Sequence, residues 1–242
     1  MLISLIRNLL TAEDKRLVFV MILAYIPALL IAIVMHEFSH GIVAYWNGDD
    51  TAKLAGRLNV NPVKHFDPIG FLMLAVIGFG WAKPVPIDPR RFRNYKKGMI
   101  TVSLAGVICN FLIAFVATGL FALYIYATKS AVMTMEMYTA GYYVFYFFAY
   151  LLQYIVLINL TLMAFNLIPI YPLDGFRVVE TLVKPDNRYV AFNYRYGSFL
   201  LLGLLVLSTV LGYISPYLDV FSLYMNAIVN MMNSIFNAIF GL

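Results

Sequence analysis

The stretch His36-Glu37-Phe38-Ser39-His40 lies inside a long apolar run, Leu17–Trp46. A membrane-spanning helix needs about 20 mostly apolar residues, so this run is long enough to cross a bilayer. Residues four apart share one face of a helix, and both imidazoles therefore project to the same side. Ionisable groups within a membrane helix are costly, so this cluster predicts a functional site at that position.

The composition around this stretch belongs to a membrane protein. Of the 242 residues, 62% are hydrophobic and 12% are charged, and the mean hydropathy is +0.83. A soluble domain has about 45–50% apolar and about 25% charged residues, so a soluble globular protein is excluded. The single cysteine excludes a disulfide framework. The net charge of +5 comes from loop Lys and Arg residues, which suit lipid headgroups better than nucleic acid.

The apolar runs predict an all-α polytopic membrane protein with about five transmembrane helices. These are expected at Leu17–Trp46, Gly98–Thr128, Thr139–Ile168, Tyr196–Ile214 and Pro216–Phe240. A sixth run, Ile69–Trp81, is too short for a span and ends in a glycine-rich turn. Because no linker or repeat divides the chain, residues 1–242 are expected to form a single membrane-embedded domain.

Two short segments predict a small membrane-associated β-sheet. The residues of Arg57–Asn61 alternate between polar and apolar, which is typical of a strand. The segment Ala82–Pro89 contains three prolines, which permit an extended edge strand but no helix.

The two histidines predict a zinc site that needs a third ligand. Neutral imidazoles bind zinc, and Glu37 beside them is placed to take a proton from water. The best third ligand is Asp174, which follows a span interrupted by Pro169 and Pro172, although it could also cap a helix starting at Gly175. The other candidates are His65, Asp67, Glu136 and Glu180. Of these, His65 and Asp67 are expected to cap or hydrogen-bond a turn.

These residues resemble the site-2 proteases, the M50-type intramembrane zinc metalloproteases, in their compact form without a PDZ domain. The resemblance covers about residues 17–180 and rests on the His-Glu-x-x-His sequence and on Asn166-x-x-Pro169-x-x-Pro172-Leu173-Asp174-Gly175. Two further stretches, Gly80–Pro86 and Ser103–Asn110, also fit, except that Val107 stands where the family commonly has proline.

The resemblance implies the roles of the site residues. One zinc ion would be bound by His36, His40 and Asp174. Glu37 would be the catalytic base, and Asn166 would help to hold the substrate carbonyl. Residues 17–180 would form the catalytic core, and residues 196–242 would form two accessory C-terminal helices.

A shared metal ion constrains the topology. His40 lies near the far end of the first span and Asp174 lies beyond the far end of the third, so these ends must be on one side. The run Ile69–Trp81 is then expected to be re-entrant rather than spanning. The loops on that side carry thirteen of the seventeen Lys and Arg residues. The active site is therefore predicted to face the cytoplasm, with the N-terminus outside and the C-terminus inside.

The predicted function is an intramembrane zinc metalloendopeptidase that cleaves in or near the transmembrane segments of membrane proteins. Its partners would be the bilayer and a transmembrane protein or peptide substrate. An alternative is a metal transporter or sensor without proteolytic activity, which would need further ligands across the bilayer. The last two spans offer only Asp219. Another alternative is a different His-Glu-x-x-His peptidase class, with Glu180 as the third ligand.

Overall fold

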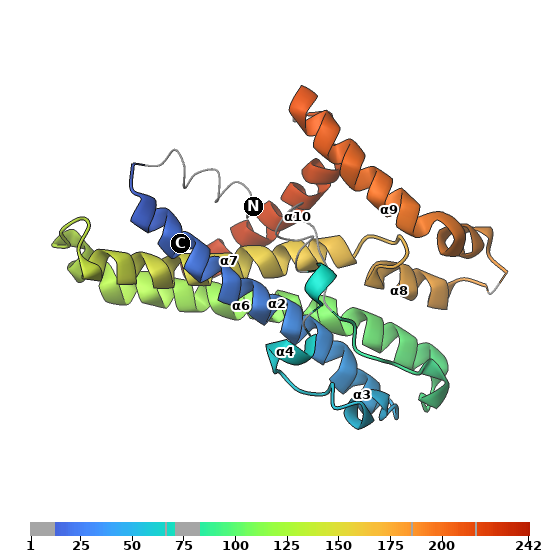
Figure 1. The fold of residues 1–242 in the computed structure, drawn as a ribbon. Coiled ribbons are helices and arrows are strands. Elements are labelled where there is room, and N and C mark those ends of the chain that lie inside the picture. Colours follow the sequence, from blue (N-terminus) through green and yellow to red (C-terminus); the bar gives the residue numbers. More distant parts are fainter. Residues whose placement is uncertain (1–12, 66, 71–82, 185, 216) are drawn as a thin grey trace.

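Three long helices form the centre of the molecule. The structure is a computed structural model, and it describes residues 13–65, 67–70, 83–184, 186–215 and 217–242. Helices α2 (Lys15–Trp46), α6 (Tyr95–Met133) and α7 (Ala140–Asn166) pack against one another in all three pairs and lie side by side (Figure 1). They correspond to the first three predicted spans.

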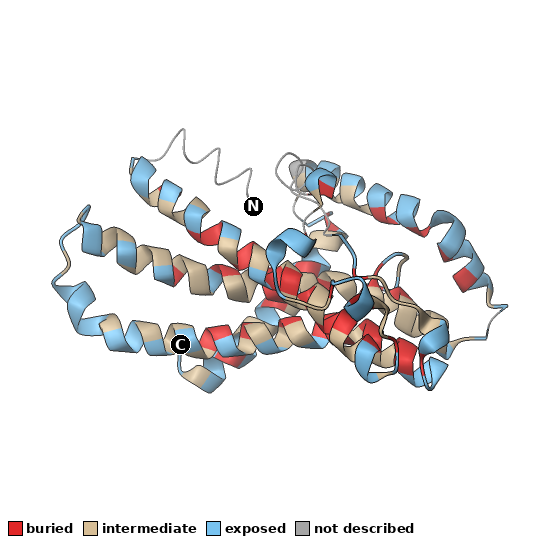
Figure 2. Ribbon diagram, turned by 60° about the horizontal axis from the view of Figure 1, so that its bottom comes forward, coloured by how far each residue is buried: buried red, intermediate tan, exposed pale blue. Residues whose placement is uncertain are grey.

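Small residues let these helices approach closely. Ala24, Ala28 and Ala32 repeat every four residues along α2 and are fully buried against α7. Their partners on α7 include Tyr154 and Ile158. In lipid there is little hydrophobic driving force between helices, so close packing of this kind contributes much of their association. Buried residues gather where the three helices meet (Figure 2).

The short elements lie at one end of this bundle. The turn between α6 and α7 marks the other end (Figure 1). At the first end lie α3 (Thr51–Leu54), α4 (Pro62–His65), the 3-10 turn η1 (Pro89–Arg91) and α8 (Asp174–Leu182). The C-terminal part of α2 and the start of α8 therefore meet at the same end, as a shared metal ion requires.

Four helices of the described part, and not five, are long and apolar enough to span a membrane. These are α2, α6, α7 and α9 (Arg188–Ile214), the last over Arg188–Gly212. The fifth predicted span does form a helix, α10 (Val220–Phe240), which packs on α6 and α7. Its mean hydropathy falls short because four asparagines recur along it, at positions 226, 230, 233 and 237.

The predicted β-sheet is wrong, because none of the described residues belongs to a strand. Over Arg57–Asn61 the asparagine side chains bond to nearby backbone groups instead. Asn59 accepts from the N–H of Asn61 at 2.9 Å, and Asn61 accepts from the N–H of Val63 at 3.0 Å. Such bonds favour turns over strand pairing, so the alternation of polar and apolar residues was misleading.

The second predicted strand is extended but unpaired over its described part, residues 83–88. The N–H of Lys83 donates to the carbonyl oxygen of His65 at 3.0 Å, and two further donors of the segment go to carboxylates. The N–H of Val85 donates to Glu37, and the N–H of Asp88 donates to Asp49. The prolines at 84 and 86 have no N–H to offer. Most of the predicted re-entrant run Ile69–Trp81 falls on residues 71–82, outside the described residues.

Candidate active site

Two histidine side chains from α2 converge. His36 and His40 are one helical turn apart and both are buried. Their Nε2 atoms lie 3.1 Å from each other. The expectation that both rings project from one face of a membrane helix is met by this geometry.

Asp174 completes the cluster from a different part of the chain. Its Oδ2 atom lies 3.3 Å from the Nε2 atom of each histidine. Asp174 is the first residue of α8 and Leu173 is its N-cap, so Asp174 does not occupy the N-cap position. His36, His40 and Asp174 form the group of His, Cys, Asp and Glu side chains, among the described residues, that could hold a metal ion.

The segment after α7 fixes the position of Asp174. A Cβ atom added at Gly175 would lie 2.4 Å from the carbonyl oxygen of Leu167, so the start of α8 is pressed against the end of α7. Phe176 is fully buried and packs edge-on against Tyr171, with ring centroids 5.7 Å apart. Glycine and phenylalanine directly after Asp174 therefore anchor the carboxylate against the bundle.

The donor set fits a zinc ion. Zinc bonds of about 2.0–2.1 Å in a tetrahedral arrangement separate two ligand atoms by about 3.3–3.4 Å. The three observed separations, 3.1, 3.3 and 3.3 Å, are close to that value. The Oδ2 atom of Asp174 is buried without a hydrogen-bond partner, as a ligand atom awaiting a cation would be. Three protein ligands also leave a fourth position open for water or substrate.

Helix α6 orients both histidines. The Nδ1–H of His40 donates to the carbonyl oxygen of Val102 at 2.7 Å, so the Nε2 lone pair of His40 is free to bind a metal. The ring of His36 lies directly against Gly106, where an added Cβ atom would be only 2.3 Å from Cε1. Only glycine leaves room for the imidazole at this position.

The cluster favours an ionised carboxylate. Burial by itself raises the pKa of the Asp174 carboxyl. When protonated, the imidazoles of His40 and His36 more than offset burial by their charge and hydrogen bonds, and they hold the pKa of Asp174 well below its usual range. Asp174 is therefore available as an anionic ligand at neutral pH.

Glu37 lies next to the metal-ligand candidates and has a backbone partner. Its Oε2 atom accepts a hydrogen bond from the N–H of Val85 at 3.0 Å. Asn166, at the end of α7, donates from Nδ2 to the carbonyl oxygen of Leu162 on its own helix at 3.0 Å.

The remaining candidate ligands lie outside the metal cluster. His65 contacts the carbonyl oxygen of Asn59, and Asp67 accepts from the N–H of Gly70, so both support turns as expected. Glu180 accepts from the hydroxyl of Tyr194 and pairs with Arg177. Glu136 lies in the turn between α6 and α7, at the opposite end of the bundle.

Three side chains that could hold a metal ion lie among apolar helices, an arrangement that fits a metalloprotease working within the membrane. The sequence profile of "Peptidase family M50" matches residues 24–204. The chain belongs to this family and is a zinc metalloprotease embedded in the membrane.

Individual relatives agree with this assignment. YwhC of Bacillus subtilis, named as a candidate zinc metalloprotease, is 41% identical over 160 residues, which are 66% of this chain and 69% of YwhC. Rip2 of Mycolicibacterium smegmatis, named in the same way, is 24% identical over 200 residues, which are 81% of this chain and 70% of Rip2. No solved structure matches the chain significantly. The alternative of a metal transporter or sensor is not favoured.

Proposed function

We propose that this protein hydrolyses peptide bonds in or near the transmembrane segments of other membrane proteins, using one zinc ion bound by His36, His40 and Asp174. The observation that carries the proposal is the convergence of these three ligand atoms at 3.1–3.3 Å within a bundle of apolar helices. The substrate class follows from where the site lies, because a peptide bond has to reach it from within or beside the membrane.

The side chains around the site have distinct proposed roles. Zinc bound there would polarise the scissile carbonyl and make a water molecule more acidic. Glu37 would take up a proton from the attacking water and later donate it to the leaving amine. Asn166 holds the substrate carbonyl, using the amide N–H that its bond to Leu162 leaves over.

We propose that the active site faces the cytoplasm and that the N-terminus is outside. The support is the excess of Lys and Arg in the loops at the active-site end. Helix α10 packs along α6. Val229 packs with Val107, whereas Phe240 lies against Gly119 further along α6, so the two helices run in the same direction. The location of the C-terminus on the inside stays a prediction.

Residues 17–180 are proposed as the catalytic core, and residues 196–242, within α9 and α10, as accessory helices. The metal-ligand candidates all come from the first of these parts. Helix α9 is exposed along much of its length, which fits an element that does not build the site (Figure 2).

The test of this function is the Glu37→Gln variant reconstituted in lipid vesicles with a transmembrane substrate. Glutamine keeps the size of the side chain but cannot take up the proton. The variant is expected to bind zinc as the wild type does and to lose all but a small residual rate of peptide cleavage. Cleavage at the wild-type rate by Glu37→Gln would rule out the proposed mechanism.

A further inference from the structure

The extended segment 83–88 crosses the catalytic helix at Glu37. The N–H of Val85 reaches the Oε2 atom of Glu37, and the Val85 side chain is buried. A Cβ atom added at Gly41, one turn further along α2, would lie 3.2 Å from Cγ1 of Val85. Val85 therefore rests on the face of α2 that carries the proposed base.

The peptide unit between Pro84 and Val85 is held from both sides. Its N–H donates to Glu37, while its carbonyl oxygen accepts from Nη2 of Arg57 at 3.3 Å. The same Nη2 atom donates to the carbonyl oxygen of Lys83 at 2.6 Å. A peptide unit is planar, with its N–H and C=O pointing in opposite directions. Fixing the carbonyl with Arg57 therefore also fixes the direction of the N–H that meets Glu37.

Arg57 is an unusual residue to find in this position. Only 8% of it is exposed, and the ion pairs among the described residues do not include it. Burying a guanidinium without an acidic partner is energetically costly. Charge pairing therefore does not explain why the Arg57 side chain donates to two backbone carbonyls. Its position instead matches the need to hold one peptide unit still.

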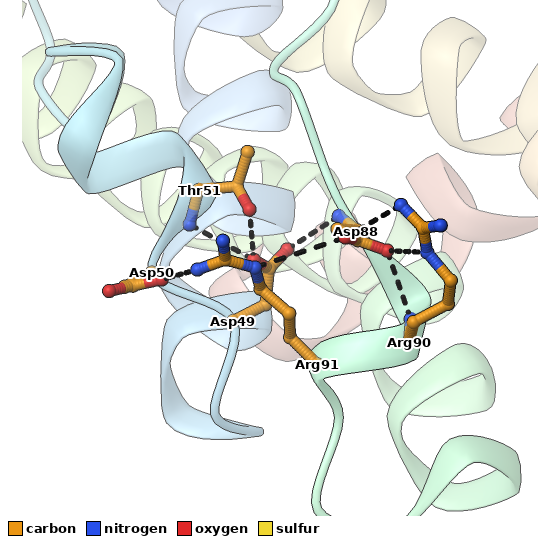
Figure 3. A network of polar contacts seen from close by, with 6 residues as sticks. All are labelled: Asp49, Asp50, Thr51, Asp88, Arg90 and Arg91. Atoms are coloured by element: carbon orange, nitrogen blue, oxygen red, sulfur yellow. Dashed lines mark hydrogen bonds and ion pairs between the residues drawn. The ribbon is translucent and has the colours of Figure 1, made fainter.

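The other end of the segment is fixed by Asp49. This residue is fully buried, and its Oδ2 atom accepts from the N–H of Asp88 at 2.7 Å. Its Oδ1 atom accepts from the N–H of Thr51 at 2.9 Å, which ties the carboxylate to the start of α3. Figure 3 shows Asp49 between Thr51 and Asp88, while Arg90 pairs with Asp88, and Arg91 pairs with Asp50 and Asp88.

Both anchors come from the chain directly after α2, at residues 49 and 57. The segment is thus fastened to the helix that carries Glu37 and the two histidines. We propose that Arg57 is a positioning residue for the catalytic base, with Asp49 as the second anchor. Through the Pro84–Val85 peptide, Arg57 fixes the position of the Oε2 atom of Glu37. The other carboxylate oxygen is left for proton transfer.

This inference rests on the proposed role of Glu37, and the experiment separates the two. Arg57→Gln and Arg57→Lys are compared with wild type in vesicles that contain a transmembrane substrate, and kcat, KM and zinc content are measured. Lys96→Met serves as the control, because it removes a positive charge from an exposed side chain near the same end of the bundle.

For Arg57→Gln the expected result is a fall in kcat of about ten- to a hundredfold, because displacing a catalytic group by about 1 Å lowers the rate by that much. KM and zinc content should stay within about twofold of wild type, because neither the substrate contacts nor the metal ligands are changed. Arg57→Lys keeps a cationic donor and should recover part of the lost kcat.

A double variant tests whether Arg57 affects catalysis through Glu37. Arg57→Gln added to Glu37→Gln should cause no further loss, because two residues that act through one group are not additive.

Three outcomes would overturn the inference while leaving the proposed function intact. The first is an inactive Glu37→Gln together with wild-type kcat in Arg57→Gln. The second is loss of zinc or of folded protein in both Arg57 variants, which would make Arg57 a structural residue. The third is a further loss in the double variant. An active Glu37→Gln would instead refute the proposed function itself.

Discussion

Replacing Gly106 with alanine tests whether α6 positions the metal ligands. The added Cβ atom would lie 2.3 Å from Cε1, 2.6 Å from Nδ1 and 2.7 Å from Nε2 of His36. Ordinary van der Waals contact begins at 3.4 Å, so the imidazole has to move by about 1.1 Å. A ligand displaced by more than about 0.2 Å no longer has a normal zinc bond.

Moving the helices apart instead of the ring does not relieve the strain. A separation of about 1 Å between α2 and α6 would lengthen the bond from His40 Nδ1 to Val102, now 2.7 Å, beyond hydrogen-bonding distance. That bond fixes the tautomer of His40, and losing such a partner costs about 10–100-fold in metal affinity. Either response damages one of the two histidines.

We therefore expect Gly106→Ala to lower zinc affinity and peptide cleavage each by about 10–100-fold. Zinc is measured by elemental analysis of the purified protein, and cleavage is measured in reconstituted vesicles. The matched control is Gly203→Ala in α9, where an added Cβ atom meets nothing within 4 Å. Full zinc content and normal cleavage in Gly106→Ala would refute the argument that α6 holds the ring in place.

Three further expectations concern the metal and α8. Asp174→Ala should abolish stoichiometric zinc binding and Glu180→Ala should retain it, as measured by zinc content; the reverse result would make Glu180 the third ligand. Removing zinc with a chelator should lower the Tm of the wild type, because an ion at a hundred times its Kd stabilises the folded state by about 2.7 kcal/mol; an equal Tm shift in Asp174→Ala would contradict this. Phe176 is fully buried, so Phe176→Ala should lower the free energy of unfolding by about 3–5 kcal/mol and weaken zinc binding in a zinc titration. Leu182 is exposed on the same helix, and Leu182→Ala should change neither quantity.

The sequence predicted those parts of the fold that depend on apolar run length. The first four spans appear as α2, α6, α7 and α9, because about 20 apolar residues in a row have few alternatives to a membrane helix. The predicted strands were wrong where hydrogen bonds between side chains and the nearby backbone outweighed the alternation of polar and apolar residues. Over Arg57–Asn61 the asparagine amides satisfy the backbone within single turns, which single-residue strand preferences do not register.

The candidate site was predictable in its side chains but not in its backbone partners. The spacing of His36 and His40 is a helical regularity, whereas several acids were left open as the third ligand until the tertiary structure brought Asp174 to them. The carbonyl of Val102 and the N–H of Val85 could not be foreseen, because every residue type offers a carbonyl and nearly all offer an N–H. The role of Gly106 likewise depends on which ring faces it.

The distance along the chain between the metal-ligand candidates has a consequence for biosynthesis. His36 and His40 lie in α2, whereas Asp174 lies 134 residues after His40, beyond the long helices α6 and α7. A growing chain therefore carries two ligands long before it gains the third. The complete set cannot form until α6 and α7 are in place and α8 has left the ribosome. The proposed zinc site therefore cannot be complete while α2, α6 and α7 are still being inserted.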